Sequence, residues 1–530
     1  MISMKGLIMK NNANNKKKRG LFRIVFGRTT IVVLLILMQV AMLFCAYAFL
    51  ANKIIYYQGV ITAISFVTLV CIINNDENAG FKIAWIIPVL AFPVFGALFY
   101  LYCRNQYSIK MIKGKLNLID ADIKQYQRKS IGADSVEVNN DLGEVGIANY
   151  LYNSGNYSAY TESGIEYYPL GDDMYVSLVR ELEKAEKFIF LEYFIIAKGY
   201  MWDSILDILK RKVSEGVEVR LMYDGMCSFV LLPYSYPKQL EEYGIKCRMF
   251  APIVPVLSTY HNNRDHRKIV VIDGRTAFTG GVNLADEYIN HIERFGHWKD
   301  TGVMIKGDAV KSMTLMFLQL WNVSEQHMER HYSKYLIDNP EIKGNQGIVI
   351  PFGDGPYNRE DIGKNVYIDI LNRAHRYVHI MTPYLILDDE MVAALRYSAE
   401  RDVETIIIMP HIPDKKYAYL LARTYYKELI EYGVKIYEYT PGFVHAKQFV
   451  SDDIRGVVGS FNLDYRSMYL HYECAVYMYN TPVISDIEKD FQDTLAKCQQ
   501  ITVKTCNEYS KIGMLIGRVL RILSLIHISE

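Results

Sequence analysis

The chain lacks the features that mark several common classes of protein. Its 530 residues carry 59 basic and 58 acidic side chains, a net charge of +1. The whole chain therefore has no basic excess of the kind that nucleic-acid-binding domains show. The eight cysteines are scattered and form no CxxC pair, which argues against a zinc site and a disulfide framework. Read as free thiols, they favour a reducing compartment around the soluble part.

Long uncharged stretches are present near the N-terminus, at residues 30–51, 54–73 and 83–102. Each is close to the roughly 20 residues that a helix needs to cross the hydrocarbon core of a membrane. A cleaved signal peptide is the alternative for the first stretch, but its 22 residues exceed the usual apolar region of about 7–15. We therefore predict a multi-pass protein of the cell membrane.

The membrane topology is left open by the charged flanks. Basic residues precede the first stretch and follow the third, and the positive-inside rule places both flanks in the cytoplasm. Three full crossings would put them on opposite sides, so one stretch could instead be re-entrant or interfacial. We expect two or three apolar helices and a cytoplasmic catalytic part.

After about residue 140 the pattern changes to short apolar runs that alternate with helical periodicity, which indicates α/β architecture. The same order of elements occurs twice, and two copies of one unit is the economical interpretation. Amphipathic patterning alone could make two such units look alike. The first copy is a helix at 174–185, a strand at 188–196, a helix at 204–214 and a strand at 217–223; the second is a helix at 366–374, a strand at 377–382, a helix at 390–399 and a strand at 405–409.

Two motifs downstream share the same spacing. HRKIVVIDGRTAFTGGVN begins at residue 266 and HAKQFVSDDIRGVVGSFN begins at residue 445. With average residue usage near 5%, six fixed positions match by accident on the order of once in 10⁷ starting points. The matched positions are His266, Lys268, Asp273, Gly280, Gly281 and Asn283, and His445, Lys447, Asp452, Gly459, Ser460 and Asn462.

The spacing suits phosphodiester chemistry. Side chains two apart on a strand share a face, so each histidine lies beside a lysine, near a tight glycine turn that carries an asparagine. A lysine supplies charge, an asparagine supplies an amide donor, and the glycines let the backbone approach a phosphate. Displacing an alcohol needs a nucleophile on one side and a proton donor on the other, and two facing histidines meet both needs.

A lone histidine in an apolar strand is more often a core residue than a catalyst, but two matching sets favour catalysis. The aspartates of the motifs, Asp273 and Asp452, are counted with the catalytic set, although an acid at a strand end can simply cap a turn. We expect their role to be mainly structural.

The duplicated pattern HxK(x4)D(x6)G[GS]xN resembles the phospholipase D superfamily, and further segments narrow the resemblance to the bacterial cardiolipin synthases. These segments are GSFNLDYRS at 459–467, NRDHRK before and around His266, WKDTG at Trp298, and WIIPVLAFPVFGALFY from Trp85. The resemblance extends from about Ile54 to residue 505. It implies two similar α/β/α halves packed as a pseudo-dimer, preceded by an α-helical membrane region.

The resemblance also implies an activity: transfer of a phosphatidyl group from one phosphatidylglycerol to another through a phosphohistidine, with release of glycerol. His266 would be the nucleophile and His445 the general acid and then base. Partners would be phosphatidylglycerol and cardiolipin in the membrane, with no nucleic acid, cofactor or metal. By the same resemblance Lys268, Lys447, Asn283 and Asn462 would hold the phosphate, and Asp300 and Glu473 would orient the histidines, with Glu287 ranked below Asp300.

The expected organisation divides the chain into six segments. They are a basic cytoplasmic leader at 1–28, a membrane region at 29–104, a linker at 105–140, a first half at 141–335, a second half at 345–505, and a C-terminal helix at 506–530. That helix is either amphipathic and interfacial or a buried closing helix.

Three alternatives for function remain at this point. Another phospholipase D-type reaction, either lipid hydrolysis or phosphatidyl transfer to a different alcohol, would share the intermediate. A nuclease is opposed by the neutral charge and the apolar stretches. A silent membrane scaffold is opposed by the two complete motifs.

Overall fold

The computed structural model describes most of the chain. The basic leader and the first apolar stretch lie outside its described residues. Contacts divide the chain into two compact units, one comprising the helices up to Ser108 and the other comprising Ile109–Pro252 with Tyr260–Arg521. The described residues are 54–75, 78–104, 107–127, 142–161, 163–252, 262–325, 327–338 and 347–527.

The N-terminal unit contains α3 (Ile54–Ile73), α4 (Ala79–Ala91) and α5 (Pro93–Arg104). The second predicted apolar stretch is one helix, α3. The third stretch is divided, because Phe92 leaves helical geometry (φ −136°, ψ 75°) and a proline begins the next helix. In the described part of the chain, no helix has the length and hydropathy of a membrane span.

The first half of the larger unit is built on a seven-stranded sheet with the order β1-β8-β6-β5-β2-β3-β4. Its strands β2, β3 and β4 run parallel, and the remaining neighbours are antiparallel. The strands are β1 (Ser163–Tyr168), β2 (Phe188–Tyr193), β3 (Glu218–Asp224), β4 (Lys246–Phe250), β5 (Ile269–Ile272), β6 (Thr276–Gly280) and β8 (Gly302–Gly307). The helices are α8 (Gly171–Glu183), α9 (Tyr200–Ser214), α10 (Gly225–Val230), α11 (Tyr236–Glu241) and α12 (Val310–Ser324).

The second half repeats this order in an eight-stranded sheet, β9-β18-β16-β15-β10-β12-β13-β19, in which only β19 has no counterpart. The predicted pair of α/β halves is therefore confirmed. The strands are β9 (Ile348–Asp354), β10 (Tyr377–Met381), β12 (Glu404–Pro410), β13 (Lys435–Tyr439), β15 (Gln448–Ser451), β16 (Arg455–Gly459), β18 (Glu473–Tyr479) and β19 (Cys498–Ile501). The helices are α13 (Ile362–Arg373), α14 (Asp389–Glu400), α15 (Lys416–Glu431), α16 (Tyr465–Tyr469), α17 (Val483–Leu495), α18 (Val503–Asn507) and α19 (Lys511–His527).

Central strands of both sheets are buried on both faces. Every residue of β2 is buried, and the apolar core of the first half gathers its side chains with those of α8, α9 and β3. Complete burial of a single leucine or isoleucine contributes about 1.5–3 kcal/mol. Because both faces of these strands are buried, their sequences are continuous β-branched and aromatic runs rather than alternating ones.

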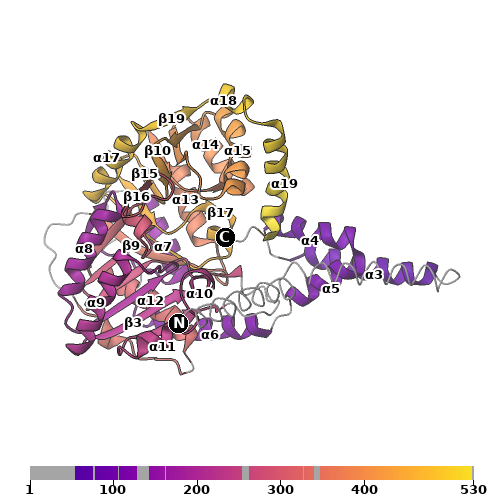
Figure 1. Ribbon diagram of the computed structural model, residues 1–530. Coiled ribbons are helices and arrows are strands. Elements are labelled where there is room, and N and C mark those ends of the chain that lie inside the picture. The colour runs from indigo at the N-terminus through magenta and orange to yellow at the C-terminus, as the bar shows by residue number, and fades with distance from the viewer. Residues whose placement is uncertain are drawn as a thin grey trace, which may run out of the picture. The chain divides into compact units, whose positions relative to one another are not determined.

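The two halves pack against each other (Figure 1), and their contacts correspond in pairs. The long helix that follows β8, α12, packs on β9 of the second half, and the equivalent helix α17 packs on β1 of the first. Strand β6 lies against β16 and β18. The motif strands of the two halves are thus brought together at the interface.

Two helices differ from the expected segmentation. The predicted linker contains α6 (Tyr107–Lys124), whose Lys115 donates to the Val323 carbonyl of α12 at 3.0 Å. Helix α7 (Leu142–Gly155) lies within the predicted first half but packs on α13 and β9 of the second. Its buried Glu144 accepts hydrogen bonds from Arg373 and Arg455 of that half at 2.6 and 2.7 Å.

Candidate active site

The backbone of each motif histidine is hydrogen-bonded to a segment of the other half. The His266 backbone N–H donates to the Tyr472 carbonyl at 2.9 Å, directly before β18. The His445 N–H donates to the Lys299 carbonyl at 2.7 Å, and here β14 (Gly442–Val444) pairs in parallel with β7 (His297–Lys299). The backbone therefore ties each histidine to the opposite half.

The side chains repeat this exchange. Nδ1 of His266 lies 2.9 and 3.0 Å from the carboxylate oxygens of Glu473, and Nδ1 of His445 lies 2.6 Å from Oδ2 of Asp300. Both carboxylates are fully buried. Each histidine is thus oriented by an acid from the other copy of the repeat, in an arrangement that neither half contains alone.

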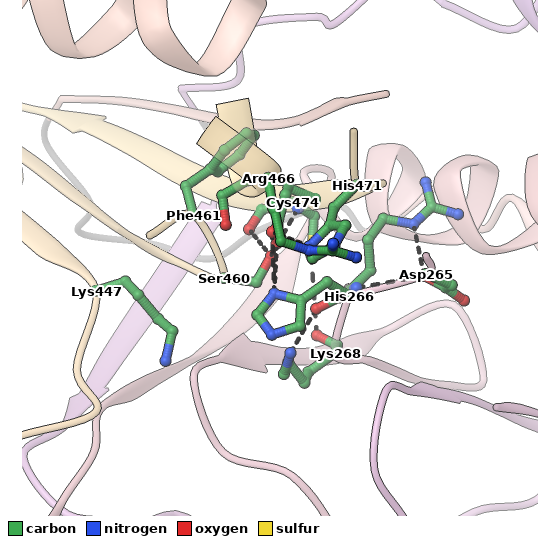
Figure 2. A network of polar contacts seen from close by, with 12 residues as sticks. Asp265, His266, Lys268, Lys447, Ser460, Phe461, Arg466, His471 and Cys474 are labelled. Carbon is green, nitrogen blue, oxygen red and sulfur yellow. Dashed lines mark hydrogen bonds and ion pairs between the residues drawn. The ribbon is translucent and has the colours of Figure 1, made fainter. Parts of the chain in front are cut away.

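These contacts define the tautomer of both rings. A carboxylate accepts, so Nδ1 carries the proton and Nε2 keeps its lone pair. Figure 2 shows the second ring nitrogen of His266 facing the region where the side chains of Lys268 and Lys447 end. A lone pair beside two cations suits attack on an anionic phosphodiester.

The lysines follow the predicted alternation along the strand. The ammonium group of Lys268 donates to the His266 carbonyl two residues earlier, and that of Lys447 donates to the His445 carbonyl. Arg267, between the first pair, points instead to Glu192 of β2 at 2.6 Å. Both lysines are nearly fully buried.

Aromatic rings and cations surround His445 and disfavour its charged form. The rings of Trp298 and Tyr288 each have centroids 5.3 Å from that of His445. Burial, followed by the charge of Lys447, lowers the pKa of His445 from 6.5 to about 4. Lys447 Nζ is 2.8 Å from Nδ1, but that nitrogen donates to Asp300 and has no lone pair to accept with. The effect of Lys447 is therefore that of a nearby charge, and the ring is neutral at pH 7.

His266 has different neighbours. Its ring meets Phe194 edge-on at 5.0 Å and lies 5.5 Å from the ring of His471. Arg466 donates from Nε to His471 Nε2 at 3.1 Å, and Ser460 donates to the Glu473 carboxylate. The network in Figure 2 thus links Arg466 and His471 to the neighbourhood of His266.

The sequence reasoning did not single out His471 or Arg466. Arg466 is part of the GSFNLDYRS segment at 459–467, whereas the sequence signal of His471 is its position between the second motif and Glu473. Together with His266 and Glu473, His471 could offer metal ligands, since donor atoms of the three lie within 4.8 Å of one another. Their existing hydrogen bonds, including one from a guanidinium, fit a polar network better than a cation site.

The two motif asparagines are buried at the ends of their turns. Asn283 accepts from the Ile195 N–H at 3.0 Å and donates to the Tyr288 hydroxyl at 2.9 Å. Asn283 therefore fixes the segment after β2. The buried Oδ1 of Asn462 has no hydrogen-bond partner among the residues that the structure describes.

The motif glycines make room for protein atoms, whereas we expected them to admit a phosphate. A Cβ on Gly281 would lie 2.0 Å from Oδ1 of Asp300, and one on Gly280 (φ +152°) would lie 2.4 Å from the Thr301 carbonyl oxygen. The second copy has Ser460 in place of Gly281, and its hydroxyl donates to Glu473. The two copies differ at this position because Gly281 lies against Asp300, whereas Ser460 binds Glu473.

Asp273 and Asp452 lie at the opposite end of the motif strands from the histidines. Asp273 accepts from the backbone N–H groups of residues 186, 187 and 188 at 2.7–2.8 Å. Asp452 accepts in the same way from residues 375, 376 and 377 at 2.8–3.0 Å. Both have positive φ. Glu287, the lower-ranked alternative to Asp300, pairs with Arg294 at 2.7 Å.

The fold and the duplicated His-Lys motifs define a phospholipase D-type protein. A profile described as "Cardiolipin synthase, PLD-like domain" matches residues 178–321 and 367–495, and one described as "Phospholipase_D-nuclease N-terminal" matches 63–104. The chain belongs to the phospholipase D-like cardiolipin synthase family.

Individual relatives agree with this assignment. A cardiolipin synthase of Geobacillus kaustophilus is 32% identical over 89% of this chain and 94% of its own, and an uncharacterized protein of Streptococcus mutans is 48% identical over 86% and 98%. The crystal structure of a Haemophilus influenzae phosphatidylserine synthase aligns with a TM-score of 0.56, at 16% identity, over 72% of this chain and 97% of its own. That structural likeness shows the fold alone.

The contacts of Asp273 predict a structural effect of its replacement. Asp273→Asn weakens the hydrogen bonds that three backbone N–H groups donate to the carboxylate, so we expect the free energy of unfolding to fall by about 1.5–3 kcal/mol. Thermal unfolding of the solubilised protein would show this, with activity retained well below the transition. His266→Asn, the control, should lose activity at every temperature, including well below its own unfolding transition. Lost activity at unchanged stability in Asp273→Asn would instead put the aspartate in the chemistry.

The low pKa of His445 predicts a pH dependence of stability. Between pH 6.5 and about 4 the unfolded chain binds a proton that the folded ring does not, so this group makes stability fall as pH decreases through that window. We expect the melting temperature of the wild type, relative to His445→Asn, to decrease from pH 7 to pH 4.5. Lys447→Met should reduce the decrease, because it removes a neighbouring charge. A constant difference across this range would contradict a depressed pKa.

Proposed function

We propose that this protein is a cardiolipin synthase that transfers a phosphatidyl group from one phosphatidylglycerol to a second one and releases glycerol. The observation that supports this most is the exchanged pair of buried carboxylate-histidine contacts, which prepares two imidazoles for one reaction. The matched family and its relatives are described as cardiolipin synthases, which supports a phospholipid substrate such as phosphatidylglycerol.

In the first step, Nε2 of His266 attacks the phosphorus of the donor lipid. The P–O bond to the glycerol headgroup breaks, and the leaving oxygen takes a proton from His445. This forms a phosphatidyl-His266 intermediate and free glycerol. Glu473 accepts the Nδ1 proton of His266 in a hydrogen bond, which stabilises the positive charge that develops on the ring.

The first step requires a protonated His445, whereas in the free enzyme the low pKa of His445 keeps its ring neutral at pH 7. A bound phosphodiester supplies a negative charge that favours the protonated ring. Its negative charge lies between the cations that lower the pKa, Lys447 and Lys268, and offsets them. We infer that binding of the donor lipid raises the pKa of His445 and charges the ring for its role as an acid.

In the second step, the neutral His445 accepts a proton from a hydroxyl of the second phosphatidylglycerol. That oxygen attacks the phosphorus, the P–N bond to His266 breaks, and cardiolipin forms. Asp300 holds His445 in the same orientation through both steps. Lys268 and Lys447, with the amides of Asn283 and Asn462, would bind the non-bridging oxygens.

The same proposal includes a membrane location with a cytoplasmic catalytic part. The apolar composition of the N-terminal unit supports it, since large apolar side chains such as Phe66, Val67, Leu90 and Leu98 are about 60% or more exposed there. Such surface is stable in contact with lipid. The basic flanks of the apolar stretches favour the cytoplasmic side.

Product analysis tests the reaction. Purified protein given only phosphatidylglycerol with a labelled headgroup should form cardiolipin and free labelled glycerol in a 1:1 ratio. Phosphatidic acid as the sole lipid product would contradict the proposal and indicate hydrolysis. Addition of serine or ethanolamine should produce no new phospholipid.

The assignment of the two histidines is tested by trapping the intermediate. His445→Ala retains the nucleophile but lacks the acid and base, so we expect it to accumulate a phosphatidyl adduct on His266 with a donor whose leaving group needs no proton, such as a p-nitrophenyl ester. Peptide mass spectrometry locates the adduct. His266→Ala should give none. An adduct on His445 in the His266→Ala protein would reverse the roles.

A further inference from the structure

The C-terminal helix α19 is docked on the second half by one face. A Cβ on Gly517 would lie 2.6 Å from the Leu420 carbonyl oxygen of α15, so the two helix backbones approach closely. Arg521 lies over the ring of Tyr425 at 4.0 Å and 4.0 Å from the Glu428 carboxylate. Figure 1 shows α19 alongside α15.

The opposite face of α19 is apolar and exposed. Ile512, Leu515, Ile516 and Val519 are exposed by 73, 62, 47 and 50%. Their spacing of three, four and seven residues places them in one sector of about 100° on a helix with 3.6 residues per turn. The docked face carries Gly517 and Arg521, so these four apolar side chains take no part in docking and are available to a second apolar environment.

The charges of α19 indicate what that environment is. The helix contains Lys511, Arg518 and Arg521 and no acidic residue. Lys511 and Arg518 are exposed and, being seven residues apart, lie one above the other along the border of the apolar sector. An apolar face bordered by cations is typical of helices that lie in the interface of an anionic membrane.

We propose that the outer face of α19 lies in the interfacial layer of an anionic lipid membrane, with its four apolar side chains among the acyl chains and Lys511 and Arg518 at the headgroups. This rests on the proposed function, since the lipid substrate is itself anionic. A protein partner would need an acidic border to match these cations, whereas an anionic bilayer provides that charge along its whole surface.

The position of α19 also connects this contact to the site. Helix α15, on which α19 is docked, packs on β11 (Leu385–Ile386). Strand β11 pairs with β17 (Leu463–Asp464), which directly follows Asn462 of the second motif. The proposed membrane contact is therefore connected, through one helix and one short ladder, to Asn462, one of the proposed phosphate-binding residues.

Lipid contact can be measured without turnover. Leu515→Cys, in a protein with Cys45, Cys71 and Cys498 replaced by serine, is labelled with an environment-sensitive fluorophore and reconstituted in phosphatidylglycerol vesicles with or without brominated acyl chains. We expect most of its emission to be lost with brominated lipid. The matched control is Asp207→Cys, on the polar exposed face of α9, which should be unaffected. Repeating both in a His266→Asn background separates lipid contact from catalysis.

Equal emission of the label at position 515 in the two kinds of vesicle would overturn the proposal. A protein cross-link from position 515 would also overturn it, because it would show that another segment or a second copy of the chain covers this face. The double variant Leu515→Asp, Ile516→Asp should turn over phosphatidylglycerol vesicles about tenfold more slowly, since two apolar side chains leave the lipid. Its rate on monomeric short-chain phosphatidylglycerol should match that of the wild type. A third result separates the two proposals. If neither the wild type nor the variants form cardiolipin from either lipid, but brominated lipid still quenches the label, the proposed function fails and the lipid contact stands.

Discussion

The site depends on one constraint: the acid that orients each histidine comes from the other half of the chain. Glu473 holds His266 and Asp300 holds His445 at 2.6–3.0 Å, and the backbone contacts of Tyr472 and Lys299 repeat the exchange. A separated half would lack both the second imidazole and the carboxylate that orients its own imidazole. Pairing of the halves and assembly of the site are therefore the same event, and the packing of α12 on β9 and α17 on β1 positions residues that are far apart in the sequence.

The twofold arrangement is broken where the chemistry requires it. His445 lies against Trp298 and Tyr288, whereas His266 lies beside the polar network of Glu473, Ser460 and His471. A reaction that uses one imidazole as nucleophile and the other as acid and base needs two unlike environments. Duplication supplies the symmetric frame, and a few substitutions, such as serine for glycine at position 460, make the two positions different.

Much of this was accessible from the sequence, because local patterns carry it. The helices and central strands of both halves follow from hydrophobic periodicity, and the catalytic candidates follow from the recurrence of His266 and Lys268 as His445 and Lys447. The sequence could not show that Asp300 faces His445 rather than His266, since spacing along the chain carries no information about partners across an interface. The packing of α7 on the second half escaped prediction for the same reason. His471 has no repeat counterpart to mark it, and the break at Phe92 shows how a proline divides a continuous apolar stretch.

If both histidines act on a single phosphorus atom, a structure with bound vanadate should show the two rings at one vanadium. Vanadate adopts the five-coordinate geometry of phosphoryl transfer. We expect one vanadium bonded to Nε2 of His266, with Nε2 of His445 on the opposite side and the ammonium groups of Lys268 and Lys447 at the equatorial oxygens. Vanadate bound by one histidine alone, with the other ring directed elsewhere, would contradict it.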